Sequence, residues 1–290
     1  MADLNTFKRL TNFDNLSPSE SDTLQKKLLL RKKTFDLKNL ARENYLKFVK
    51  QVWPEFIEGP HHVQIAKKFQ ALAEGKIKRL IVNMPPRHTK SEFASFLFPA
   101  WMMGRNPKLK IIQTTHTAEL SYRFGRKVRN LMEENTFQDI FDDIKLSQDS
   151  KAAGRWETNQ GGEYFAAGVG GAITGRGADT SGPRQRLQPG GRIVIVMTRW
   201  STKDLTGQLM KAQSDVKADQ WDVIEFPAIM PNEKPVWPEY WKLDELESVK
   251  ASLSVAKWNA QWQQNPTSEE GSIIKREYWK IWDKPKLPKL

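Results

Sequence analysis

Short runs of apolar residues alternate with longer stretches of helical periodicity along most of the chain. Runs rich in β-branched residues occupy 79–83, 109–113, 192–196 and 221–226. The first three are each followed by a stretch with helical spacing of apolar residues, at 92–103, 117–134 and 203–212. Strands that are apolar throughout and are separated by helices are typical of a parallel sheet covered on both faces. The pattern therefore predicts an α/β fold with a mostly parallel sheet flanked by helices.

The N-terminal segment has a different pattern, which predicts helices alone. Ser17-Pro18-Ser19-Glu20 is typical of a capping box with Pro at the first helical position. Leucines with helical spacing follow this box, and a second helix is predicted from about Leu37 to Pro54. Basic residues are dense here, at Lys26, Lys27, Arg31, Lys32 and Lys33. They favour a solvated helix face, and a DNA-contacting face is the alternative.

Composition and charge narrow the function classes. The chain has 290 residues, with 46 Lys and Arg against 34 Asp and Glu, which gives a net charge of +12. Such a basic balance favours a polyanionic partner, nucleic acid before an acidic membrane. The absence of Cys excludes disulfides, a thiolate zinc site and a cysteine nucleophile. No apolar run approaches the roughly 18 residues of a membrane span, and the polar start predicts no signal peptide.

The segment from Leu80 to Glu92, LIVNMPPRHTKSE, carries the clearest candidate chemistry. A buried strand leads into a loop, and Lys90 and Ser91 open the next helix. In a P-loop, backbone N–H groups at a helix N-terminus face an anion, a Lys reaches the β- and γ-phosphates, and a hydroxyl ligates Mg²⁺. Met84 and Thr89 stand where the motif G-x-x-x-x-G-K-S/T has glycines. On spacing alone, a plain strand–turn–helix with an exposed lysine stays open as the alternative.

This segment, Met84-Pro-Pro-Arg-His-Thr-Lys-Ser-Glu92, resembles the deviant Walker A motif of the large terminase subunits of tailed bacteriophages. Other segments resemble the same family in the expected order. They are 59–64 (GPHHVQ, the segment at the nucleotide base), 161–179 (the glycine-rich approach to Walker B), 196–207 (the coupling motif and its helix) and 258–271 (the junction before the nuclease domain). The resemblance covers roughly residues 45–285. It implies a P-loop NTPase domain over residues 46–264, an N-terminal helical segment over 1–45, and a linker over 265–290 toward a nuclease domain.

The resemblance also implies what the chain does and with what. The family is an ATP-driven motor that uses Mg²⁺ and threads double-stranded viral DNA into a procapsid. The implied partners are double-stranded DNA, the small terminase subunit, the portal protein and sister subunits in a ring. The implied location is the host cytoplasm, transiently at the procapsid portal, without a membrane. Two alternatives stay open, another P-loop nucleic-acid translocase such as a helicase, and a catalytically dead DNA-binding or assembly protein.

Site roles follow from the resemblance position by position. Lys90 is the expected β/γ-phosphate ligand, Ser91 the Mg²⁺ ligand, and Arg87 a cis arginine that neutralises charge in the transition state. Thr198 and Arg199 are expected to sense nucleotide and to couple hydrolysis to movement. The other expected nucleotide contacts are Pro86, His88 and Thr89 in the loop, and His62 and Gln64 near the base.

The sequence departs from the family at Thr180-Ser181. The family there has an apolar strand that ends in two acids, one for Mg²⁺ and one that activates water, and this chain has neither. Loss of this inner strand would leave the strands at 79–83 and 192–196 to pair directly or to separate. Asp142 and Asp143 are poor substitutes, because their apolar run is short. Either residues are missing from the sequence at this junction, or the protein carries a true deletion, and only in the second case do we expect an ATPase without turnover. We expect no nuclease activity, because the three carboxylates of the nuclease would lie beyond Leu290.

Overall fold

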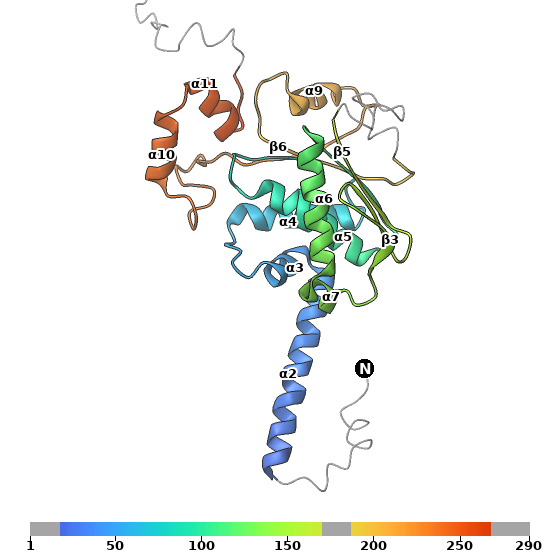
Figure 1. Cartoon of the computed structure of the whole chain (residues 1–290). Coiled ribbons are helices and arrows are strands. Elements are labelled where there is room, and N and C mark those ends of the chain that lie inside the picture. The colour runs from blue at the N-terminus through green and yellow to red at the C-terminus, as the bar shows by residue number, and fades with distance from the viewer. Residues whose placement is uncertain (1–17, 170–186, 268–290) are drawn as a thin grey trace, which may run out of the picture.

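The computed structural model describes residues 18–169 and 187–267. Helices flank sheets that contain parallel strands, which confirms the α/β class (Figure 1). The helical elements, of which η2 and η4 are π-helical, are α2 (Pro18–Glu43), α3 (Tyr45–Val52), α4 (Pro60–Ala73), η2 (Glu92–Leu97), α5 (Phe98–Arg105), α6 (Ala118–Glu133), α7 (Asn135–Ile140), α9 (Leu205–Ala212), α10 (Leu243–Ala251), α11 (Val255–Lys257) and η4 (Trp258–Trp262). The strands are β1 (Arg79–Asn83), β2 (Lys110–Thr115), β3 (Leu146–Ala152), β4 (Arg155–Thr158), β5 (Glu163–Gly168), β6 (Ile193–Met197) and β7 (Asp222–Glu225).

β1 is the middle strand of a three-stranded parallel sheet with the order β6-β1-β7. The register places Asn83, the last residue of β1, opposite Met197 of β6 and opposite Glu225 of β7. Four of the five β1 residues are buried, as expected for a strand covered on both faces. Because the three strands run in one direction, their carboxyl ends meet at a single edge of the sheet.

The other strands form a second, mixed sheet with the order β2-β5-β4-β3. β2 pairs with β5 in parallel, whereas β4 pairs with both β5 and β3 antiparallel. The expectation of a mostly parallel sheet is thus confirmed in part, because both sheets contain parallel strands but the second also contains antiparallel pairs. The physical reason lies in the short turns at 153–154 and 159–162, because antiparallel strands can be joined by a tight turn whereas parallel strands need a long crossover.

β1 and β6 pair directly along their whole length, from Arg79 opposite Ile193 to Asn83 opposite Met197. Of the two outcomes expected for loss of an inner strand, the structure thus has direct pairing. The sequence departure at Thr180-Ser181 and residues 170–179 of the glycine-rich segment lie outside the described residues, whereas residues 161–169 contain β5.

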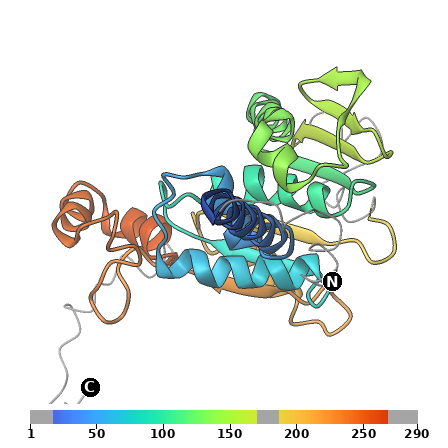
Figure 2. The same cartoon turned by 90° about the horizontal axis from the view of Figure 1, so that it is seen from below.

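α2 is one continuous helix, where two helices were predicted to share residues 18–54. No Gly or Pro interrupts the chain between Lys33 and Glu43, so nothing ends the helix there. The break comes at Asn44, which caps α3 by accepting a hydrogen bond from the Lys47 N–H (3.0 Å). α2 projects from the body and only its C-terminal end packs (Figure 1), so that it is seen end-on in the view from below (Figure 2). Across 18–169 and 187–267, no helix combines the length and apolarity that a bilayer crossing requires.

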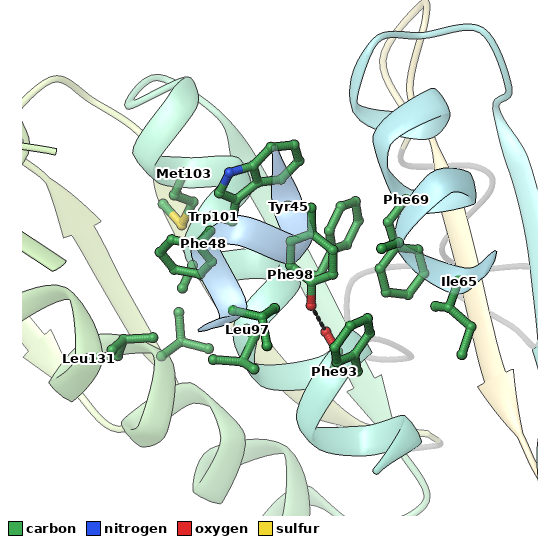
Figure 3. Packing of buried hydrophobic residues seen from close by; sticks show 14 of the residues in the cluster. Tyr45, Phe48, Ile65, Phe69, Phe93, Leu97, Phe98, Trp101, Met103 and Leu131 are labelled. Carbon is green, nitrogen blue, oxygen red and sulfur yellow. Dashed lines mark hydrogen bonds between the residues drawn. The ribbon is translucent and has the colours of Figure 1, made fainter. Parts of the chain in front are cut away.

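The largest hydrophobic core joins α3 and α4 to the helix that follows β1 (Figure 3). Tyr45 lies at its centre, with its ring 5.1–5.6 Å from the rings of Phe69, Phe93, Phe98 and Trp101. The Tyr45 hydroxyl donates a hydrogen bond to the Phe93 carbonyl. This carbonyl belongs to η2, so the core fixes the helix that begins beside the loop after β1.

We expect Tyr45→Phe to lower the free energy of unfolding by about 1 kcal/mol, because it deletes one buried hydrogen bond and keeps the ring packing. Denaturant unfolding followed by circular dichroism measures the change. Tyr122→Phe is the matched control, since the Tyr122 side chain is exposed, and it should change the value by less than about 0.5 kcal/mol. Equal values for the two variants would contradict the role of the hydroxyl.

Candidate functional site

Residues 84–91, here called the β1 loop, connect the central strand to a helix at the carboxyl edge of the sheet. The helix begins at Lys90, and its first backbone hydrogen bond runs from the Phe93 N–H to the Thr89 carbonyl (2.9 Å). Helical geometry then continues through η2 and α5 to Arg105. This is the strand–loop–helix order predicted from the sequence.

Two residues of the β1 loop have left-handed backbone conformations, Arg87 with φ 58° and Thr89 with φ 60°. Such angles are uncommon for residues other than Gly, and a β-branched residue is an outlier there. Thr89 occupies the position at which the P-loop motif has its second Gly. The loop therefore has, at this position, the backbone conformation that glycine adopts without strain.

The start of the β1 loop is fixed to the end of β6. The Met84 N–H donates to the Met197 carbonyl (3.1 Å), and the Thr198 hydroxyl donates to the Met84 carbonyl (2.9 Å). Thr198 is buried. The predicted sensor residue is thus in direct contact with the candidate phosphate loop.

Lys90 is half-buried, and its ammonium donates to the Pro85 carbonyl across the loop (3.0 Å). Burial lowers the pKa of Lys90 from 10.5 to about 8. The backbone N–H groups of residues 89–92, at the start of the helix, have no backbone acceptor among the described residues. Arg87 and Ser91 are exposed on the same loop. Helix N-terminal N–H groups without a backbone acceptor in the described part of the chain, a half-buried cation and an exposed hydroxyl together form a site suited to an anion.

His62 and His88, predicted as nucleotide contacts, have no exposed surface. The His88 Nδ1 hydrogen-bonds the Pro86 carbonyl (2.8 Å), and its ring stacks on Trp241 with centroids 5.9 Å apart. Burial lowers the pKa of His88 to about 4 and the pKa of His62 to about 2, so both rings are neutral. These two histidines pack the loop against the body. Gln64 is exposed on α4.

Arg199 lies in a polar network across the carboxyl edge of the sheet. Its Nε donates to the Asp204 carboxylate (3.0 Å) and its Nη1 to Glu225 at the end of β7 (3.2 Å). Asn83 at the end of β1 donates to the same Glu225 oxygen (2.7 Å) and accepts from the Thr206 hydroxyl (3.0 Å). The Arg199 guanidinium is thus neutralised by two carboxylates.

Asp204 holds this network at the start of α9. It caps the helix by accepting from the Gly207 N–H (2.9 Å), and it also accepts from the Trp200 N–H (2.9 Å). Burial alone would raise the pKa of Asp204, but these N–H groups and the Arg199 guanidinium together lower it below its usual 3.8. The carboxylate is therefore charged at neutral pH.

The structure brings the predicted residues of the β1 loop, Thr198 and Arg199 to one edge of the sheet. Sequence reasoning missed Asn83 and Glu225, which end β1 and β7 beside them. A polar residue at the last position of an apolar strand was the available signal, because ligands bind at the carboxyl ends of parallel strands. Asp142, the poor substitute acid, instead pairs with Arg42 at the end of α2 (2.7 Å).

The side chains at this edge of the sheet provide only part of the ligand set that a divalent metal requires. In the part of the chain that the structure describes, no group of three or more His, Cys, Asp or Glu side chains is arranged to hold a metal ion. The Ser91 hydroxyl is exposed where a P-loop metal ligand would lie. Mg²⁺ commonly takes only one or two protein ligands besides phosphate oxygens and water. The residues present therefore fit a metal that arrives with a phosphate ligand, and they do not fit an independent metal site.

No protein-family model matches this chain, and no curated protein matches it. The motifs and the geometry of this edge of the sheet are therefore the observations that bear on function.

We expect Asp204→Ala to lower the free energy of unfolding by about 3 kcal/mol, because it deletes a helix cap and leaves Arg199 with one carboxylate fewer. Asp244→Ala, at an exposed position in the first turn of α10, is the control and should cost less than about 0.5 kcal/mol. Because the folded pKa of Asp204 is lowered, its contribution is present above pH 3.8 and is lost as the pH falls further. Denaturant unfolding at neutral and acidic pH measures both effects, and a pH-independent difference would contradict the charge argument.

Proposed function

We propose that the β1 loop binds the phosphates of a nucleotide, with Lys90 as the cation that reaches them. The observation that carries the proposal is the position of Lys90. Its ammonium is half-buried and, within the described residues, its hydrogen-bond acceptor is a carbonyl and not a carboxylate. The residue opens a helix whose first backbone N–H groups have no backbone acceptor among the described residues. An anion at this place would satisfy the N–H groups and the charge together. Arg87, exposed on the loop, supplies a second positive charge for the same anion.

We infer that the nucleotide is ATP and that the chain is the motor part of a phage terminase large subunit. This rests on the ordered motifs and on the contacts of Thr198 and Arg199 with the loop and with the neighbouring strand ends. In that reading, a nucleotide-dependent change in the β1 loop reaches β6 through the Thr198–Met84 hydrogen bond. Double-stranded DNA, the small terminase subunit, the portal protein and sister subunits in a ring belong to this proposal.

Hydrolysis of the nucleotide requires groups beyond those that bind its phosphates. Mg²⁺, when bound with the nucleotide, would supply charge neutralisation at the phosphates, and the Ser91 hydroxyl is the side chain placed to hold it. At the strand ends, Glu225 already binds Asn83 and Arg199, and Asp204 already caps α9. No further carboxylate of the described residues ends β1, β6 or β7. Within the described residues this favours the second candidate function, a chain that binds nucleotide and does not turn it over. Turnover by the terminase motor would need a carboxylate from outside the described residues.

We expect Lys90→Met to weaken ATP binding about 100-fold, because a charge-assisted hydrogen bond to phosphate is lost while the apolar stem stays in place. Isothermal titration calorimetry with ATP and Mg²⁺ measures the affinity. Lys67→Met is the matched control, since it removes the same charge from an exposed position on α4. Its affinity should equal that of the wild type.

The pH dependence of the ATP affinity provides a second test of the role of Lys90. Above pH 8 the unliganded Lys90 is increasingly neutral and must take up a proton to hold a phosphate, so wild-type affinity should fall about tenfold per pH unit. Lys90→Met should lack this fall. Equal affinity of wild type and Lys90→Met at all pH values would refute the assignment.

We expect the chain to bind double-stranded DNA without sequence preference, with an affinity that falls steeply with salt, because Lys and Arg release counterions from the phosphates. Arg123 and Arg126 are exposed on α6, whereas Lys127 of the same helix pairs with Glu92. Fluorescence anisotropy over a salt series measures the slope. Arg123→Gln with Arg126→Gln should reduce the slope by about two if α6 contacts DNA. Binding that does not depend on salt would contradict the electrostatic account, and preference for single strands would favour stacking on tryptophans.

A further inference from the structure

Thr89 requires support for its backbone conformation. With φ 60° it is a β-branched residue in the left-handed region, where its Cβ crowds the neighbouring carbonyl. Such a conformation persists only where the surroundings hold it in place. A neighbouring group must therefore hold the backbone of Thr89 in this conformation.

The Thr89 hydroxyl belongs to a directed chain of hydrogen bonds that begins at α4. The Gly59 N–H donates to the Nδ1 of His62 (2.9 Å), so this nitrogen carries the lone pair and the hydrogen lies on Nε2. The His62 Nε2 therefore donates to the Thr89 hydroxyl oxygen (2.6 Å). The Thr89 hydroxyl then donates to the His88 carbonyl (2.7 Å). Each donor in this series of hydrogen bonds therefore faces one acceptor, and the direction of every bond is fixed.

His62 is itself held rigidly. It has no exposed surface, and aromatic rings surround it, with centroids at 4.7 Å for Phe56, 4.9 Å for Trp237 and 5.2 Å for Phe93. At Gly59 a side chain would place its Cβ 2.5 Å from Trp237, so only glycine brings this N–H against the His62 ring without moving Trp237. The donor that faces Thr89 is thus fixed by packing on all sides.

We propose that His62 is a positioning residue that holds Thr89 in the left-handed conformation which a phosphate loop ordinarily obtains from glycine. The pair His62–Thr89 replaces that glycine, and it keeps the backbone N–H groups of the β1 loop turned toward the anion. The role of the pair in anion binding rests on the proposed nucleotide site, whereas its effect on the backbone conformation of Thr89 does not depend on that site. His62 is then a support of the loop and not a contact of the nucleotide base.

The test compares wild type with His62→Phe, Thr89→Gly and the two changes together. Each variant is measured for its unfolding midpoint in denaturant without ligand, and for its affinity toward ATP with Mg²⁺ by calorimetry. His62→Phe keeps a ring and deletes the donor, so we expect a loss of affinity of about tenfold. Thr89→Gly in the His62→Phe background removes the strained Cβ, and affinity should return to within about threefold of wild type.

The unfolding midpoint should respond to Thr89→Gly with opposite sign in the two backgrounds. In wild type, glycine breaks the bond to His62 and the midpoint falls. In His62→Phe no bond is left to lose, so glycine relieves strain and the midpoint rises. A role of His62 in packing alone would give the same shift in both backgrounds, and that result would overturn the proposal.

Further variants keep the proposal testable if His62→Phe does not fold. Thr89→Val keeps the β-branched shape without the hydroxyl and should weaken ATP binding as His62→Phe does, whereas Thr89→Ser should bind like wild type. Equal affinity for Val and Ser would overturn the assignment. If wild type binds no ATP, the proposed function fails, and the midpoints still decide on His62.

Discussion

The pairing of β1 with a parallel strand on each side is the constraint on which the candidate site depends. A strand buried on both faces must satisfy its backbone groups through its neighbours, and β6 and β7 do so along its length. The same pairing fixes where all three strands end. Asn83, Met197 and Glu225 lie side by side in the register, so the segments that follow them start at one edge. The β1 loop, Thr198 and Arg199 are neighbours for this reason.

The parts of the structure that follow from local pattern could be predicted from the sequence. The strands β1, β6 and β7 are short apolar runs, and α6 has Thr117 at its start as a cap, so their places agree with the periodicity. The division into two sheets could not be predicted, because hairpin pairing of residues 146–168 depends on which strand meets which. The prediction divided α2 into two helices for a related reason. Asn44 acts as a cap only when the chain turns there, and the local pattern does not show this turn.

The candidate site shows the same limit at the level of side chains. Lys90, Ser91 and Thr198 belong to motifs, and the sequence alone pointed to them. His62 and His88 are polar in sequence and were assigned to the ligand, yet their rings face Thr89, Trp241 and the core. Burial of a neutral imidazole depends on partners far away in the chain, such as Trp237 and Trp241. No spacing rule within the loop reveals those partners.

The distribution of charge distinguishes the β1 loop from the rest of the edge. Arg199 is fully compensated, because Asp204 and Glu225 face it and Asp204 is fixed by helix and turn N–H groups. Lys90 has no such partner within the described residues, and the fall of its pKa to about 8 corresponds to a cost of about 3 kcal/mol for keeping the ammonium charged there. If this charge served no ligand, an uncharged residue at position 90 would avoid that free-energy cost. A charged lysine is costly when alone and is stabilised when an anion arrives, and an anion would also serve the first N–H groups of the helix that Lys90 opens, which have no backbone acceptor among the described residues. The local electrostatics therefore favour an anion at the β1 loop and leave Arg199 as a fixed part of the scaffold.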